Sequence, residues 1–429
     1  MGSPYTSELA ETLAPGLLRR FERYVQIDTQ SARERTQSPS TPGQLDLARV
    51  LVDELIEAGI DDAALDENGY VTASLPGNAG NAGNGRAIGL IAHMDTSPDA
   101  PGVGVAPVVH RDYDGGVIAL PRDGTRLDPA SMPELLGKRG HDIVSSSGDT
   151  LLGADDKAGV AEIMAAVAHL AAHPDLPHPP LRIAFTPDEE IGEGATLFDI
   201  ERFGAFCAYT MDGSEIGEFQ DETFSAFEAI AAVRGVDVHP GHATGKLVNA
   251  LRLVAQIVAA LPSDRLTPET TSGREGFIHP YEMSGSAARA EVRAILRDFD
   301  EDKLAGHVAL FERTAREVVD RAPGAELELE VRRQYRNMGE YLRAVPFVVD
   351  AARAAIAAEG LDPVRIPIRG GTDGSRLSEM GLPTPNIFTG GHEFHSVREW
   401  ASVQDMAAAA ATIIRLAEVW SSPEWTAKR

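Results

Sequence analysis

Blocks of apolar and polar positions alternate along both ends of the chain and predict strands and helices in turn. The segments 87–92, 181–185 and 206–211 are short runs of mostly apolar side chains, a pattern typical of strands buried on both faces of a sheet. Residues 7–27 and 160–173 instead repeat apolar side chains at helical spacing. Strands that alternate with helices in this way predict an α/β fold with parallel strands.

The middle of the chain has a different pattern, which begins near Glu222. There apolar and charged side chains alternate singly, which predicts strands with one solvent-exposed face. The predicted strands are 229–238, 275–283, 289–297 and 327–332, with helices at 247–261 and 304–318. The order strand, helix, strand, strand, helix, strand is that of a ferredoxin-like domain.

The chain therefore divides into one domain interrupted by an inserted domain. The interrupted domain comprises residues 1–222 and 338–429, and the insertion comprises residues 223–337. Residues 98–147 are rich in Gly, Pro and Asp, so we expect a long excursion with little regular structure, which is often functional. The Gly- and Asn-rich stretch 77–85 predicts a flexible tip between two strands.

Composition excludes several classes of function. A chain of 429 residues is long enough for two domains. The net charge of −26 argues against nucleic acid as a partner, because nothing offsets phosphate repulsion. Cys207 is the only cysteine, which favours a reducing compartment and hence the cytoplasm. Neither a signal-peptide pattern nor an apolar run of membrane-spanning length is present, so no membrane partner is expected.

Carboxylate and histidine side chains follow the predicted buried strands directly. Since sites in open α/β sheets form beyond the carboxyl ends of strands, we expect these side chains to converge at one edge. The group comprises His93, Asp95, Asp155, Glu189, Glu190, Asp212 and His395. Two imidazoles and five carboxylates suit two divalent ions. Taken alone, the adjacent Asp155 and Asp156 are better explained by a helix N-terminus, where one aspartate caps the helix and the other is solvated.

Several longer motifs resemble those of the M20 family of metallopeptidases, and within it the tripeptide aminopeptidases. The motifs are His93–Pro98, Leu151–Gly159, Phe185–Glu190, Tyr209–Gly213, Val238–Gly241, Arg297–Asp300, Arg369–Gly374 and Phe388–Gly391. They occur in the family's order nearly from end to end. The resemblance implies a catalytic α/β domain with a central mixed sheet flanked by helices, interrupted by a ferredoxin-like α+β lid domain.

The resemblance also implies a site with two Zn²⁺ ions, although Co²⁺ and Mn²⁺ share these ligands. His93, Asp155 and Asp212 would hold one ion, and Asp155, Glu190 and His395 the other. Asp155 would bridge them, because two close cations need an anion between them.

Further residues have catalytic or binding roles in such a site. Asp95 would accept the second N–H of His93 and fix its tautomer, and Glu189 would be the general base. His239 of the lid would stabilise the oxyanion, although a histidine that only shapes a turn fits the sequence too. Arg297 and Arg369 would bind a substrate carboxylate, with surface salt bridges as the alternative.

We therefore expect an enzyme that removes the N-terminal residue of tripeptides with a two-zinc-activated water. The short peptide would be its partner, with a possible homodimer formed through the lid. The alternatives are another M20 dipeptidase, an N-acyl-amino-acid amidohydrolase, or an inactive regulatory protein on the same scaffold. His392 departs from the aromatic residue expected before the ligand histidine, so the preferred N-terminal residue stays open.

Overall fold

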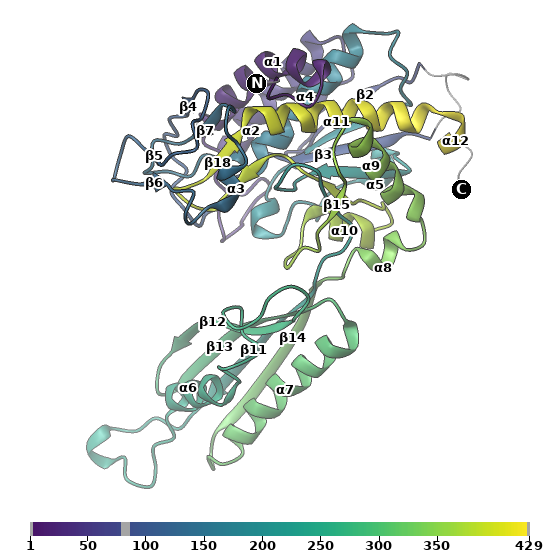
Figure 1. Ribbon diagram of the computed structural model, residues 1–429. Helices are drawn as coiled ribbons and strands as arrows, with labels where there is room; N and C mark the ends of the chain where they lie inside the picture. The colour runs from purple at the N-terminus through teal and green to yellow at the C-terminus, as the bar shows by residue number, and fades with distance from the viewer. Residues whose placement is uncertain (1–2, 79–85, 427–429) are drawn as a thin grey trace. The chain divides into compact units, whose positions relative to one another are not determined.

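The chain forms two units in the computed structural model, which describes residues 3–78 and 86–426 (Figure 1). The first unit comprises residues 1–221, 341–366 and 372–429, and the second comprises residues 222–340 and 367–371. The sequence-based boundaries differ from this division mainly at 367–371, which they placed with the first unit. Most of the tip expected at 77–85 lies outside the described residues.

An eight-stranded mixed sheet forms the centre of the first unit, in the order β1-β2-β8-β3-β9-β16-β10-β15. Strands β3 (Ile88–His93), β8 (Leu181–Thr186) and β9 (Cys207–Met211) are parallel neighbours and almost completely buried, as their apolar runs predict. The other strands are β1 (Ala64–Leu65), β2 (Val71–Leu75), β10 (Glu218–Gln220), β15 (Val364–Arg365) and β16 (Asn386–Ile387). The expected α/β class is therefore confirmed.

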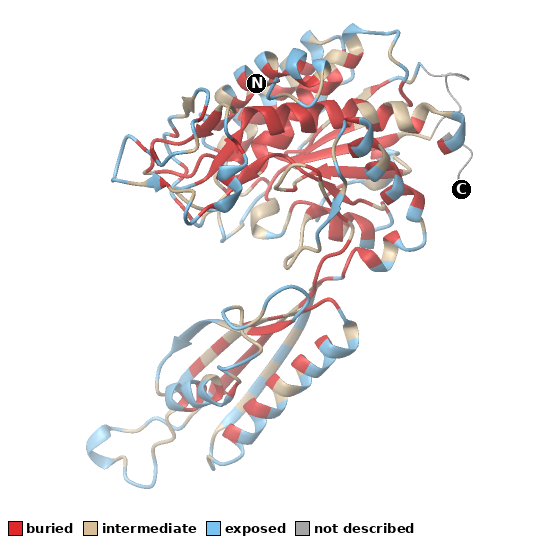
Figure 2. Ribbon diagram, in the orientation of Figure 1, coloured by how far each residue is buried: buried red, intermediate tan, exposed pale blue. Residues whose placement is uncertain are grey.

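Helix α4 (Ala154–Ala172) packs directly on β3 and β9, and α1 (Glu8–Val25) and α11 (Val403–Ser421) pack against α4. Because α4 and α11 lie in the interior, they are apolar almost all round, and Figure 2 shows their buried surfaces. The other helices of more than one turn in the described part of the first unit are α2 (Gly43–Glu57), α9 (Pro346–Ala358) and α10 (Asp373–Glu379). No helix in the described part of the chain combines the length and apolar character needed to cross a membrane.

The excursion expected to lack regular structure contains short elements and a core of its own. It holds β4 (Val108–His110), β5 (Ile118–Ala119), β6 (Arg126–Leu127), α3 (Pro133–Leu136) and β7 (Ile143–Ser145). β4 and β7 join a four-stranded sheet with β17 (Gly391–His392) and β18 (Trp400–Ser402). Widely spaced apolar residues of the excursion pack around the buried Trp400. The excursion therefore has little regular structure, as expected, but local periodicity does not reveal its core, because that core includes Trp400, a residue remote in sequence.

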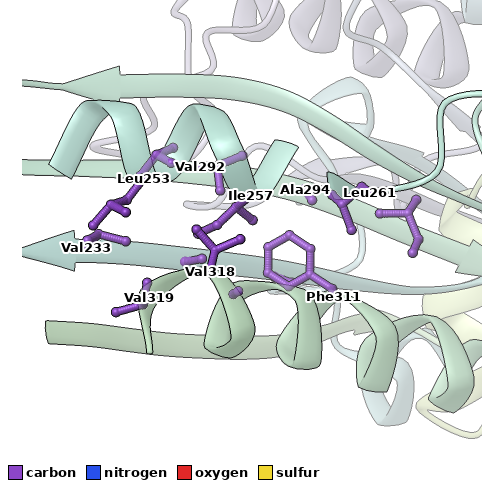
Figure 3. Packing of buried hydrophobic residues seen from close by; sticks show 14 of the residues in the cluster. Val233, Leu253, Ile257, Leu261, Val292, Ala294, Phe311, Val318 and Val319 are labelled. Carbon is purple, nitrogen blue, oxygen red and sulfur yellow. The ribbon is translucent and has the colours of Figure 1, made fainter. Parts of the chain in front are cut away.

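The second unit has the expected ferredoxin-like order of elements. Its antiparallel sheet has the order β12-β13-β11-β14, with one helix after β11 and another after β13. The elements are β11 (Ser225–Arg234), α6 (Ala250–Ala260), β12 (Phe277–Gly285), β13 (Arg289–Asp298), α7 (Glu301–Val319) and β14 (Glu326–Tyr335). Side chains from α6 and α7, including Ile257 and Phe311, pack on the apolar face of the sheet (Figure 3).

Candidate metal centre and active site

Three neighbouring parallel strands bring three of the five candidate ligands to one edge of the sheet in the first unit, while Asp155 lies at the start of α4 and His395 between β17 and β18. His93 is the last residue of β3, and Asp212 follows β9 directly. Glu189 and Glu190 lie in a short 3-10 helix, Glu189–Ile191, which follows β8. Because β8 and β9 flank β3 in parallel, their carboxyl ends meet at this edge.

Asp155 lies between the two imidazoles. Its Oδ1 atom is 2.9 Å from Nε2 of His93, and its Oδ2 atom is 3.2 Å from Nε2 of His395. The two carboxylate oxygens of one residue thus face two different histidines. This is the arrangement expected of a carboxylate that bridges two metal ions.

Two groups of potential ligands share Asp155. His93, Asp155 and Asp212 form the first group and Asp155, Glu190 and His395 the second, and within each group the ligand atoms lie within 4.8 Å of one another. In the second group, Glu190 Oε2 is 2.9 Å from His395 Nε2. The structure therefore brings together all five residues that the sequence nominated as ligands.

The charges at this edge favour bound cations. Burial, together with repulsion from Asp155, raises the pKa of Asp212 well above its usual range and that of Glu190 to about 7. Burial opposes charging of His395, but its hydrogen bonds to Asp155 and Glu190 outweigh burial and raise its pKa to about 11. Glu190 Oε1 is buried without a hydrogen-bond partner among the described residues. Divalent ions would neutralise these carboxylates and complete the coordination of that oxygen, so the residues fit such a group.

Asp95 has more partners than the one expected of it. The Asp95 atom nearest to His93 Nδ1 is the backbone carbonyl oxygen, at 3.1 Å, while the carboxylate Oδ1 lies 3.4 Å away. The carboxylate accepts hydrogen bonds from the backbone N–H groups of Glu189 and Glu190, at 2.9 and 3.1 Å. Asp95 therefore fixes the turn that carries both glutamates as well as the imidazole.

Glu189 belongs to neither ligand group. Burial and the nearby Asp212 and Asp373 raise the pKa of Glu189 well above its usual range. No described residue donates a hydrogen bond to its carboxylate, while its backbone N–H is held by Asp95. A carboxylate whose backbone is held in place and whose oxygens accept no hydrogen bond from the protein is suited to proton transfer beside a charged site.

Sequence reasoning left Asp156 without a role and did not mention Asp99, and both lie near the candidate ligands. Asp156 accepts hydrogen bonds from the backbone N–H groups of Gly159 and His93, both at 3.2 Å. Asp155 and Asp156 have non-helical φ and ψ, so the regular part of α4 begins after them, and the bond from Gly159 to Asp156 is the cap that one of the adjacent aspartates was expected to provide. Asp99 lies 3.3 Å from Nδ1 of His395 and can fix that ring. The only feature of the sequence that could have indicated a role for Asp99 is its position four residues after Asp95.

The three candidate residues of the second unit have different surroundings. His239 is exposed, and its Nδ1 accepts a hydrogen bond of 3.1 Å from the backbone N–H of Gly241. Arg369 donates to the backbone carbonyls of Gly273 and Glu275, at 3.0 and 2.9 Å, and to Thr271.

Arg297 differs from Arg369 because it keeps a free donor. Its Nη1 donates to the Arg369 carbonyl oxygen at 3.4 Å, but its buried Nε has no partner among the described residues. Of the two arginines, Arg297 is therefore the better placed to receive an anion. The alternative considered for Arg297 and Arg369 was a surface salt bridge. Among the described residues, neither guanidinium forms an ion pair with a carboxylate.

A third group of possible ligands comprises Glu215, His392 and Asp405. The ammonium group of Lys138 lies 2.5 Å from Glu215 and 2.7 Å from Asp405, so the chain supplies its own cation there. His392 stacks on Trp400 with ring centroids 4.0 Å apart, and burial with the nearby Lys138 lowers its pKa to about 3. The unusual histidine is thus a neutral, buried ring.

Comparisons with known proteins agree with this geometry. A model of peptidase family M20/M25/M40 matches residues 151–419. A protein of Vibrio parahaemolyticus serotype O3:K6 (strain RIMD 2210633), peptidase T, is 47% identical over 403 residues, covering 94% of this chain and 98% of that protein. Peptidase T of Geobacillus thermodenitrificans (strain NG80-2) is 44% identical over 405 residues, with 94% and 98% coverage. The crystal structure of aminopeptidase PepT from Bacillus cereus ATCC 10987 superposes with a TM-score of 0.72, 23% sequence identity, and coverage of 95% and 99%.

The chain belongs to peptidase family M20/M25/M40. The resemblance drawn from its motifs is therefore confirmed, and the protein is a peptidase that acts on peptide substrates. Relatives similar to it over nearly its whole length carry the name peptidase T.

Proposed function

We propose that this peptidase is a zinc-dependent tripeptide aminopeptidase. The observation that carries the proposal is the position of Asp155, whose two oxygens face His93 and His395 within two ligand groups. The relatives named peptidase T support the substrate class, as does a tripeptidase from Staphylococcus aureus that has the same fold with a TM-score of 0.74.

His93, Asp155 and Asp212 would hold one ion, and Asp155, Glu190 and His395 the other. Imidazole and carboxylate ligands in these numbers suit Zn²⁺, and also Co²⁺ or Mn²⁺. When bound, such ions supply Lewis-acid charge that polarises a carbonyl oxygen and eases deprotonation of water.

Glu189 transfers the proton during hydrolysis. One of its carboxylate oxygens accepts a proton from the attacking water and then passes it to the nitrogen of the leaving peptide. Asp95 holds the Glu189 backbone, which keeps the carboxylate in place through both steps. Burial and the surrounding carboxylates raise the pKa of Glu189, which suits a group that must take up a proton and hold it briefly.

The lid supplies groups that bind charge on the substrate. Because Nδ1 of His239 accepts a hydrogen bond, Nε2 carries the N–H of the neutral ring and can donate to the developing oxyanion. Arg297, whose Nε has no partner among the described residues, would bind the carboxylate at the far end of the tripeptide through its guanidinium group. Arg369, whose donors are taken by backbone carbonyls, shapes the surface beside Arg297.

The test is hydrolysis of matched substrates by the Zn²⁺-loaded protein. A free-amine tripeptide should yield its first residue and a dipeptide, and the N-acetylated tripeptide should be cleaved far more slowly. The Asp155→Ala variant purified in parallel controls for contaminating peptidases. Preference for the acetylated substrate would indicate an N-acyl-amino-acid amidohydrolase instead, and a lack of hydrolysis of either would favour a regulatory role. A homodimer formed through the lid and a cytoplasmic location both stay predictions.

A further inference from the structure

Glu399, which precedes β18, is a buried carboxylate with an unusual set of partners. Its side chain accepts hydrogen bonds from three backbone N–H groups between residues 152 and 155. Oε2 receives the backbone N–H groups of Leu152 and Gly153 at 2.7 and 2.8 Å, and Oε1 receives that of Asp155 at 3.0 Å. The residue is only 1% exposed.

The loop is shaped to point these N–H groups at one carboxylate. The amides before the regular part of α4 have no partner within the helix, so they need an acceptor from elsewhere. Gly153 has φ of +83°, in the left-handed region that favours glycine. This conformation helps to turn consecutive N–H groups toward a common anion, as in other backbone anion sites.

Glu399 also joins the two loops that carry candidate ligands. It lies four residues after His395 on the same segment, and it holds the backbone N–H of Asp155 directly. Asp155 and His395 are two members of the second ligand group, with 3.2 Å between Asp155 Oδ2 and His395 Nε2. The distance between these ligands therefore depends on a side chain that belongs to neither group.

We propose that Glu399 is a positioning residue for the metal centre, which holds Asp155 in the orientation that lets it serve both ligand groups. The proposal rests on the proposed two-metal function. It assigns Glu399 no contact with substrate or ion. Groups that orient metal ligands in this way commonly change metal affinity by about 10–100-fold when they are mutated.

The experiment measures Zn²⁺ affinity by titration of the metal-free protein against a chromophoric chelator. In Glu399→Gln, the single amide oxygen can keep the N–H groups of Leu152 and Gly153, but the amide NH₂ then faces the N–H of Asp155. We expect the dissociation constant of the more weakly held ion to rise about 10–100-fold, with the fold retained. At saturating Zn²⁺ the KM for a tripeptide should change little, because no group that touches substrate is altered.

Glu359→Gln is the matched control. Glu359 is also buried, at 2% exposure, and accepts hydrogen bonds from Thr6, Ser7 and Arg415, none of which belongs to a ligand loop. Thermal unfolding of both metal-free variants corrects for a general loss of stability. If Glu399→Gln binds Zn²⁺ as tightly as Glu359→Gln, the positioning role is wrong.

The titration needs no turnover, so it stays informative even if tripeptides prove not to be the substrate. Suppose that the wild-type protein binds Zn²⁺ normally but does not cleave tripeptides, and that Glu399→Gln binds Zn²⁺ more weakly. The proposed substrate class would then be wrong, but the positioning role of Glu399 would stand.

Discussion

The adjacent residues Glu189 and Glu190 offer a sharp test of the assigned chemistry. Glu189→Gln conserves the size of the side chain but removes its ability to accept a proton. The structure indicates little cost to folding, because no described residue donates to the Glu189 carboxylate and its backbone N–H bond to Asp95 is unchanged. Loss of a general base commonly lowers kcat by about 10²–10⁴. At about 1.4 kcal/mol per tenfold change, this is about 3–5 kcal/mol of transition-state stabilisation.

Glu190→Gln should have a different effect although the two side chains are neighbours. Glu190 Oε2 lies 2.9 Å from His395 Nε2, and the residue is a member of the second ligand group. An amide is a far weaker ligand than a carboxylate for a divalent ion, so this variant should lose one ion.

The assay combines steady-state kinetics on a free-amine tripeptide with elemental analysis of each variant after gel filtration. Glu189→Gln should retain two ions and have a lowered kcat, and Glu190→Gln should retain about one ion. If Glu189→Gln loses an ion while Glu190→Gln keeps both, the roles of the two glutamates are reversed. If Glu189→Gln keeps wild-type kcat, a different group takes the proton.

Three further predictions follow from the contacts described. Asp155→Ala should lose both activity and most bound metal, because both ligand groups include Asp155; two tightly held ions in elemental analysis would contradict this. His239→Ala should lower kcat by about 10²–10³ with KM and Zn²⁺ content little changed, as for a lost oxyanion donor, whereas wild-type kinetics would make it a turn histidine. Burial opposes ionisation of Asp298, but its hydrogen bonds to His307 and to the Asp300 backbone N–H, together with nearby positive charge, outweigh burial and lower its pKa from 3.8. The stabilising effect of Asp298 is therefore present above about pH 4 and is lost as pH falls through the folded pKa. Urea unfolding of Asp298→Asn should therefore show a smaller loss of stability between pH 6 and pH 3 than wild type, and equal losses would refute this.

The sequence by itself determined the fold class and which five side chains gather as candidate metal ligands. Apolar runs such as 87–92 and 206–211 specify strands buried on both faces, and the residues that follow parallel strands must meet at one sheet edge. The apolar pattern of a strand is local and periodic, so the sequence alone reveals it. The alternation at 289–297 likewise predicted the half-exposed strand β13.

Only the tertiary structure decided which neighbouring side chain does what. Asp155 and Asp156 are adjacent and chemically identical, yet Asp155 faces the imidazoles while Asp156 caps α4 and holds the His93 backbone. Arg369 resembles a substrate clamp in sequence, but its donors meet backbone carbonyls of a loop about a hundred residues earlier. Glu399 meets the Asp155 loop across a separation of 244 residues. Hydrogen bonds are directional and short-ranged, so partners of this kind are fixed only when packing brings distant segments within about 3 Å.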